Sequence, residues 1–279
     1  MKKTVFLSVS CCLLTVAMMS CKKSVKNALD SHELSPDETA LVVSAGFNGN
    51  WAEKTADGNY LIEGDILLTS SQLKEMAGAG SSHEVIVANE EHYRTTNVVS
   101  TPSSGQRTIT VRLGSGFPTY FSTGLDQALA RYNNLNLKIR FVRVTSGGNI
   151  VITSANLGTT STGGCILGQA SGFPSGGNPA SGFTLSNSSC ALAYLNTANR
   201  ADEVIAHEIG HCIGFRHTDY MNRSSCGQNQ NEGSAGIGAV HIPGTPTTVT
   251  GSYNSWMMAC TNNNPAFSSS DATALNYVY

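Results

Sequence analysis

The stretch from Asp202 to His217 constrains the fold and the chemistry of this chain more than any other. It reads Asp-Glu-Val-Ile-Ala-His-Glu-Ile-Gly-His-Cys-Ile-Gly-Phe-Arg-His. Isoleucine recurs every four residues and the first two positions are acidic, so the pattern predicts an amphipathic helix with favourable charges at its start. Residues four apart share one face of a helix, so His207 and His211 present two imidazoles to the same point.

The residues that follow complete a predicted metal site. Gly214 can leave the helical region at low steric cost and turn the chain back, which allows His217 to supply a third nitrogen. Three imidazoles leave the fourth position of a zinc ion open for water, as in a catalytic rather than a structural site. Glu208 follows the first histidine and is the predicted general base for this water.

This pattern resembles the metzincin zinc peptidases, and His-Glu-Ile-Gly-His at 207–211 resembles the bacterial dual-action HEIGH metallopeptidases within that clan. The resemblance implies a zinc-dependent endopeptidase, in which a zinc-bound water activated by Glu208 hydrolyses a peptide bond. It also implies a methionine in a tight turn beneath the metal. Met257 is the preferred candidate and Met258 is the alternative. No tyrosine stands two residues beyond either one, so the metal-contacting tyrosine of some metzincins is not implied.

Alternating and helical patterns predict an α+β fold. A helix is expected over 121–133, and strands are expected at 107–113, 137–144 and 149–153. The stretches 158–190 and 221–270 are rich in small polar residues and Gly, and both are expected to be irregular. The metzincin resemblance implies a twisted mixed sheet with two helices, an irregular C-terminal part with the Met turn, and a final helix over 267–275.

The chain begins with the pattern of a lipoprotein signal peptide. A short cationic start precedes an apolar run that ends at Cys21, so residues 1–20 are predicted to be a signal peptide. The resemblance to the bacterial lipobox implies that Cys21 is acylated and anchors an exported protein at the outer membrane or cell surface. An ordinary cleaved signal with an incidental cysteine is the alternative. Residues 21–36 are polar and aperiodic and are expected to be a tether.

Residues 37–91 are predicted to form a pro-like domain before a catalytic domain at 92–279. Within it, Leu61-Ile62-Glu63-Gly64-Asp65-Ile66 resembles the latency motif of astacin-like metzincins, which implies that Asp65 occupies the zinc position that water needs. A carboxylate is a suitable oxygen ligand for zinc, and Gly64 permits a close approach of the backbone. A hairpin turn without a role in latency is the alternative.

Five cysteines follow Cys21, so at least one of them is unpaired. Disulfides are permitted in an oxidising compartment and would join the ends of the irregular regions. Cys212 would then remain as a small buried apolar residue. Connectivity is not fixed by sequence, so other pairings stay open. The expected disulfides are Cys165–Cys190 and Cys226–Cys260.

The partners of the protein follow from the site, because a net charge of −2 gives no electrostatic case for nucleic acid. A protein or peptide is the expected substrate, and Gly168–Pro174 resembles the edge strand that binds an extended peptide by strand addition. A peptidase that processes one native target is an alternative to a broad one. A second alternative is a lipid-anchored zinc-containing binding protein without turnover. The presence of Glu208 argues against it, because a site that only binds a metal ion needs no general base.

Overall fold

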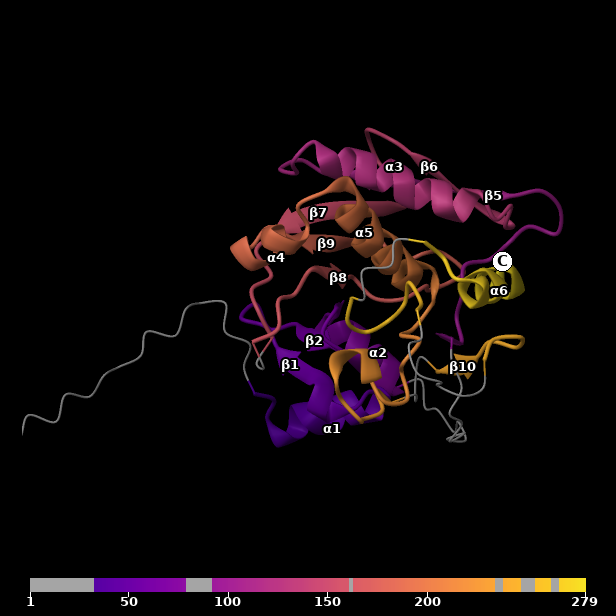
Figure 1. The fold of residues 1–279 in the computed structure, drawn as a ribbon. Coiled ribbons are helices and arrows are strands. Elements are labelled where there is room, and N and C mark those ends of the chain that lie inside the picture. The colour runs from indigo at the N-terminus through magenta and orange to yellow at the C-terminus, as the bar shows by residue number, and fades with distance from the viewer. Residues whose placement is uncertain (1–32, 79–91, 161–162, 234–237, 247–253, 262–265) are drawn as a thin grey trace, which may run out of the picture.

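One sheet of eight strands runs through the computed structural model, which describes residues 33–78, 92–160, 163–233, 238–246, 254–261 and 266–279 (Figure 1). The strand order is β1-β2-β3-β8-β9-β7-β5-β6. Its strands are β1 (Ala52–Lys54), β2 (Tyr60–Ile62), β3 (Ile66–Leu68), β5 (Arg107–Leu113), β6 (Ile139–Arg143), β7 (Ile150–Ala155), β8 (Gly168–Ala170) and β9 (Gly182–Ser186).

The other elements are a separate two-stranded ribbon, six α-helices and two short 3-10 turns. The ribbon pairs β4 (Tyr93–Arg94) with β10 (Val240–His241). The helical elements are α1 (Pro36–Ser44), η1 (Gly49–Trp51), α2 (Ser70–Gly78), α3 (Tyr120–Asn133), α4 (Ser189–Tyr194), α5 (Ala198–Ile213), η2 (Ser224–Cys226) and α6 (Ser269–Val278).

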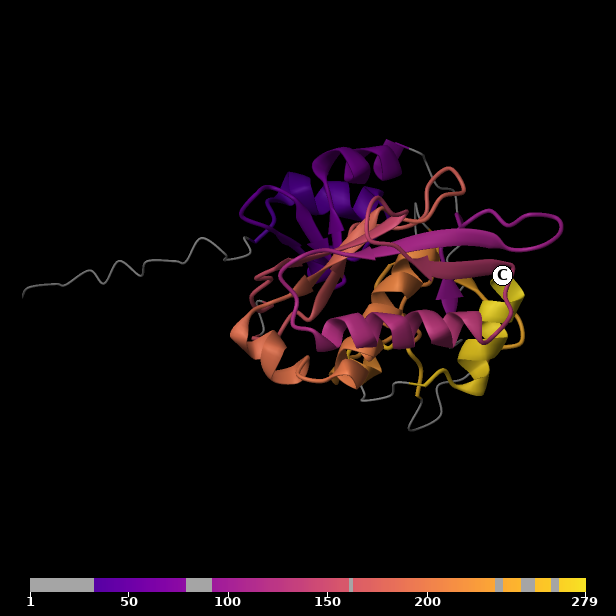
Figure 2. The ribbon, with the colours of Figure 1, turned by 90° about the horizontal axis from the view of Figure 1, so that it is seen from above.

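The larger part of the sheet carries α3 and α5 on one face (Figure 2). β5 pairs in parallel with β6 and β7, β7 pairs in parallel with β9, and β8 runs antiparallel to β9. α3 and α5 pack against each other, and Tyr132 of α3 donates a hydrogen bond of 2.7 Å to the carbonyl oxygen of Ala206 in α5. This contact joins α3 to the turn of α5 that bears the first two histidines of the motif.

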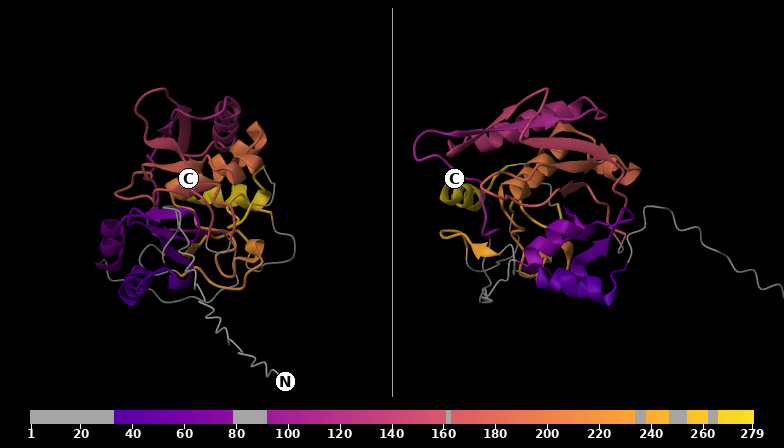
Figure 3. Two further views of the ribbon diagram at one scale, coloured as in Figure 1. Left: turned by 90° about the vertical axis from the view of Figure 1, so that its left-hand side faces the viewer. Right: turned by 180° about the vertical axis from the view of Figure 1, so that it is seen from behind.

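Residues 33–78 form a smaller part with an apolar cluster of its own. β3 pairs in parallel with β8, with Ile66 opposite Ala170, so this part extends the sheet of the larger one (Figure 3). The buried residues of the cluster come from both sides of that junction. They are Val42, Ala45, Phe47, Ala52, Tyr60, Ile62, Ile66, Leu68, Leu73 and, from the larger part, Phe173.

The predicted α+β class is confirmed. β5 coincides with the strand predicted at 107–113, and α6 extends to Val278, beyond the predicted end at 275. The prediction that 158–190 is irregular is wrong, because this stretch contains β8, β9 and the start of α4. Phe183 and Leu185 of β9 are buried in the core between β7 and β8. Their hydrogen-bond partners are distant in sequence, so a composition rich in Gly and Ser does not reveal the strand.

The predicted signal peptide and Cys21 lie outside the described residues. Pro36, the last residue of the predicted tether, is the first residue of α1. Of 221–270, the described residues contain η2, β10 and the first two residues of α6 as their only regular elements. Within the described ranges, no helix has both the length and the hydrophobicity that a membrane span requires.

Both disulfides that the sequence analysis expected are present in the structure. The remaining cysteine of the described residues, Cys212, is free and fully buried in α5. One disulfide joins the loop before β8 to α4, and the other joins η2 to the segment after Met258. They are Cys165–Cys190 and Cys226–Cys260.

Candidate metal centre

Helix α5 places the first two histidines of the motif side by side. The helix begins at Thr197, whose side-chain oxygen accepts a hydrogen bond of 3.3 Å from the Arg200 N–H. Its apolar residues are buried against the sheet and α3, which fixes the direction of the opposite face. His207 and His211 project from that face, and their Nε2 atoms lie 3.1 Å apart.

The chain reverses at the end of α5 and brings in the third histidine. Gly214 has a φ of 108°, in the left-handed region that favours glycine, and its N–H donates to the carbonyl oxygen of His211 at 3.0 Å. A β-carbon there would lie 3.1 Å from the carbonyl oxygen of Asn97. The chain then passes through Arg216, whose N–H donates to the Tyr93 carbonyl at 2.9 Å, and reaches the site with His217.

All three histidines hold the same tautomer. Nδ1 of His207 lies 2.8 Å from the carbonyl oxygen of Trp256, and Nδ1 of His211 lies 2.9 Å from that of Phe215. A carbonyl oxygen only accepts, so each Nδ1 carries the proton and donates it. Nδ1 of His217 donates to the Glu232 carboxylate at 2.7 Å. Each Nε2 is therefore left with its lone pair toward the centre of the group.

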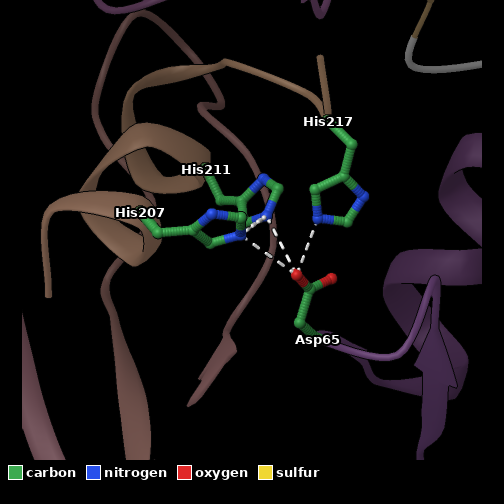
Figure 4. A group of neighbouring side chains, drawn as sticks. All are labelled: Asp65, His207, His211 and His217. Atoms are coloured by element: carbon green, nitrogen blue, oxygen red, sulfur yellow. Dashed lines mark hydrogen bonds and ion pairs between the residues drawn. The ribbon is translucent and has the colours of Figure 1, made fainter. Parts of the chain in front are cut away.

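Asp65 lies where these lone pairs meet (Figure 4). Its Oδ2 is 3.2 Å from Nε2 of His207, 3.3 Å from that of His211 and 2.7 Å from that of His217. The residue that sequence singled out thus contacts all three histidines.

Asp65 ends a tight turn between β2 and β3. Glu63 and Gly64 have φ angles of 57° and 89°, and the Asp65 N–H donates to the carbonyl oxygen of Ile62 at 3.3 Å. The carbonyl oxygen of Asp65 accepts from the N–H of Ala170 in β8 at 2.7 Å. Asp65 therefore belongs to a hairpin turn and also faces the histidines.

The donor set fits a zinc ion. Nitrogen and oxygen ligands at roughly 2.0–2.1 Å in a tetrahedron lie about 3.3 Å from one another. The donor atoms of Asp65, His207, His211 and His217 all lie within 4.8 Å of one another, and four of their six separations lie between 2.7 and 3.3 Å. Burial lowers the pKa of His211 to about 4, which keeps this imidazole neutral as a metal ligand must be.

Glu208 lies beside the histidines in a cavity of about 560 Å³. Burial, and then the negative charge of Asp65, raise the pKa of Glu208 well above its ordinary value. Among the described residues, its Oε2 has no hydrogen-bond partner, as suits a group that serves a bound water or substrate. Gly168 of β8 packs so closely that a β-carbon there would lie 2.8 Å from the Glu208 carboxyl carbon. Both disulfides contribute residues to the cavity wall.

Met257 packs against α5 and is 1% exposed, whereas Met258 lines the cavity. The Met257 segment contacts α5 at Gly210, where a β-carbon would overlap the Met257 sulfur and lie 3.0 Å from the Trp256 Nε1. The Met257 carbonyl oxygen accepts from the N–H of Thr218 at 2.7 Å. Of the two candidate methionines, Met257 is therefore the one whose sulfur approaches Gly210, between His207 and His211 on α5.

Sequence reasoning missed a buried network of charged residues behind His217. Arg216, which is 0% exposed, donates to Glu63, and Arg223 donates to Glu232 and to the Glu63 carbonyl oxygen. Burial raises the pKa of Glu232, but the hydrogen bond from His217 and the charges of Arg223 and Arg216 outweigh it and lower that pKa to about 2. The available signal for this network was Arg216 itself. It stands between Phe215 and the ligand His217, and an arginine that is buried there requires an acidic partner.

Comparisons with known proteins were made for the whole chain. The chain matches the family model described as "Dual-action HEIGH metallo-peptidase" over residues 60–279. A search of curated proteins gave no match. Among solved structures, myroilysin is 20% identical, with a TM-score of 0.38, over 65% of this chain and 97% of that chain. High choriolytic enzyme 1, a hatching enzyme zinc-protease from the medaka fish Oryzias latipes, is 19% identical, with a TM-score of 0.37, over 65% and 93%.

The family match covers most of the chain. It begins at residue 60 and so includes Asp65 as well as the three histidines, Glu208 and Met257. Membership implies a metallopeptidase and a metal ion, which the histidine cluster is built to hold. The chain belongs to the family of dual-action HEIGH metallopeptidases.

Proposed function

We propose that this protein is a zinc-dependent endopeptidase whose own N-terminal part keeps it latent. The observation that carries the proposal is the convergence of three Nε2 atoms, from His207, His211 and His217, beside the buried carboxylate of Glu208. A purely structural zinc site would have four protein ligands and no need of a base. Zinc, when bound, supplies Lewis-acid polarisation of a peptide carbonyl and makes water more acidic.

Glu208 would carry the protons of the reaction. Its raised pKa makes the carboxylate a stronger base than an exposed glutamate, so it can take a proton from the attacking water. The same carboxyl group then delivers that proton to the nitrogen of the leaving amine. Trp256 and Phe215 hold two of the imidazoles through their carbonyl oxygens, so the ligands do not need to reorganise during this transfer.

The strand β8 would hold the substrate. Its outer edge lies next to the cavity that contains Glu208, and it supplies an N–H at Ala170 for a main-chain partner. An extended polypeptide that adds to such an edge continues past both ends of a three-residue strand. This supports cleavage within a chain rather than removal of terminal residues.

Latency is supported by two contacts of the N-terminal part. Asp65 places a carboxylate oxygen among the three Nε2 atoms, where a water would otherwise be bound. β3 occupies the edge of β8 through the pairing of Ile66 with Ala170. Asp65 thus excludes the water, and β3 competes with a substrate for the edge of β8, which accords with the astacin-like role inferred for Asp65.

The test is hydrolysis of a mixed library of fluorogenic peptides by the full chain with zinc. We expect the Asp65→Ala variant to cleave at least about tenfold faster than the wild type, because it frees the water position. Chelation should abolish that activity, and adding Glu208→Gln to Asp65→Ala should lower it by about 10²–10⁴-fold.

Two results would contradict parts of this proposal. Equal activity of the Asp65→Ala variant and the wild type, both folded and loaded with zinc, would exclude latency through Asp65. Absence of any cleavage by the folded, zinc-loaded Asp65→Ala variant would favour a single-target processor or a binding protein without turnover.

We also propose that the protein is exported and anchored through acylated Cys21. The support is the sequence of the first 21 residues. The test is mass spectrometry of the protein purified from membranes of a bacterial host. A mature N-terminus at Cys21 with the added mass of acyl chains is expected, and a soluble product cleaved elsewhere would exclude the anchor.

A further inference from the structure

We propose that Glu232 is a positioning residue that fixes the imidazole of His217 for metal binding. The inference rests on the proposed zinc site, and it identifies the residue that holds the third ligand, His217, in place. The Glu232 Oε1 lies 2.7 Å from Nδ1 of His217, and both side chains are fully buried. Because a carboxylate can only accept, the proton stays on Nδ1 and Nε2 keeps its lone pair for the metal.

His217 needs this support more than the other two ligands. His207 and His211 are oriented by α5 and by main-chain carbonyl oxygens of neighbouring segments. His217 follows the reversal at Gly214 and lies outside any helix or strand. Among the three imidazoles, it is the only one whose Nδ1 is held by a side chain and by a negative charge. A charged acceptor strengthens the hydrogen bond and makes Nε2 a better electron donor.

Glu232 is itself held in place. Its N–H donates to the carbonyl oxygen of Tyr220 at 3.1 Å, and its carbonyl oxygen accepts from the N–H of Asn48 at 2.9 Å. Arg223 donates to the same Oε1 that faces His217, and Arg216 Nη2 lies 3.9 Å from Oε2. The carboxylate is therefore fixed by backbone and by charge, which is what a support for a ligand requires.

A purely structural role for Glu232, as the partner of two buried arginines, predicts a different result from a positioning role. Loss of a structural ion pair lowers the stability of the metal-free fold but leaves the metal site intact. Asp202 provides the matched control, because it is also a buried carboxylate bonded to an arginine, Arg131, and contacts no ligand histidine. It lies on α5, five residues before His207.

The experiment measures zinc affinity of the full chain by competition with a chromophoric chelator, together with stability of the zinc-free protein. The variants are Glu232→Met, Glu232→Gln and Asp202→Asn. We expect Glu232→Met to bind zinc up to about 100-fold more weakly and Glu232→Gln about tenfold more weakly, since the amide oxygen still accepts but carries no charge. Asp202→Asn should lose stability and keep the affinity of the wild type.

Each outcome decides the matter. Wild-type affinity in a folded Glu232→Gln variant overturns the proposal, and so does an equal loss of affinity in Asp202→Asn. If Glu232→Met does not fold, the near-isosteric glutamine variant carries the test. If the wild-type chain does not bind one zinc ion per molecule, the proposed function itself is contradicted. If the wild type binds zinc and the Glu232 variants bind it equally well, only the positioning role is contradicted.

Discussion

Gly210 stands where the ligand-bearing helix meets the Met257 segment. A glycine in the interior of a helix costs roughly 1 kcal/mol relative to alanine, so its presence here needs a reason. The reason is steric, because a β-carbon would overlap the Met257 sulfur and approach Trp256 Nε1. The same segment orients His207 through the Trp256 carbonyl oxygen, so the contact at Gly210 bears directly on the metal site.

Gly210→Ala is expected to lower the free energy of unfolding by about 1–3 kcal/mol despite the better helix propensity of alanine, because the added methyl group overpacks the site. The measurement is chemical denaturation followed by circular dichroism. Gly78→Ala is the matched control, since Gly78 ends α2 with no atom within 4 Å of the added carbon. An unchanged stability of Gly210→Ala would show that the Met257 segment moves freely.

The residues of the site differ in how far they could be predicted from sequence. The proximity of His207 and His211 follows from helical spacing, which is a local property. The contact of His217 with Glu232 depends on the path of an irregular stretch, and the sequence around Glu232 has no periodicity that reveals it. Asp65 is distant from the histidines in sequence, and only the resemblance to a latency motif indicated it.

At the scale of single elements, prediction succeeded where a pattern was local. α3 and α5 carry apolar residues at helical spacing, and β5 alternates buried and more exposed residues. β9 was missed, and β8 was indicated only by the resemblance of Gly168–Pro174 to an edge strand, because a three-residue strand and a five-residue strand gain their stability from neighbours in the sheet. The start of α6 was better marked, because Ser268 caps it and Asp271 lies in its first turn, whereas α1 was not predicted.

The start of α1 makes a specific prediction about pH. Lys54, and then the N–H of Ser35, lower the pKa of Glu38 from 4.5 to about 2. A carboxyl group whose pKa is lowered by folding stabilises the folded state above pH 4.5, and this contribution is lost as the pH falls through about 2. The unfolding free energy of Glu38→Gln should therefore depend less steeply on pH than that of the wild type in this range.

The comparison requires urea denaturation of both proteins between pH 4.5 and 2. The effect should be small, because the Glu38 side chain is 20% exposed and solvent screens its charge. Parallel pH profiles for the two proteins would exclude this contribution. A steeper profile for Glu38→Gln would show that the pKa of Glu38 is not lower in the folded state than in the unfolded state.

At the scale of the whole molecule, two apolar clusters are joined by one sheet and one buried ion pair. Arg216 of the larger part donates to Glu63 of the smaller part, and neither side chain is exposed. Glu63 also sits two residues before Asp65, in a turn with positive φ. Sequence could not predict this joint sheet, because the strands that meet lie about 100 residues apart.

Removal of the Glu63 carboxylate should loosen the smaller part. Glu63→Ala leaves Arg216 buried without this partner, which typically costs about 3–5 kcal/mol. We expect amide hydrogen exchange in β1, β2 and β3 to become faster while that in α3 and the middle of α5 stays unchanged. Glu63→Gln is the control, because it keeps an acceptor for Arg216 and should change exchange less. Uniform acceleration across the chain would show that the two parts unfold as one.

The pairing of β3 with β8 has a consequence for solubility. β8 is bonded to β9 on one side and to the N-terminal part on the other, so the intact chain leaves neither side of it open. Once residues 33–78 depart, its outer main-chain groups become a template for strands of any origin, including those of a second copy. Under the proposed latency, the N-terminal part would therefore also protect the protein from aggregation until a substrate takes its place.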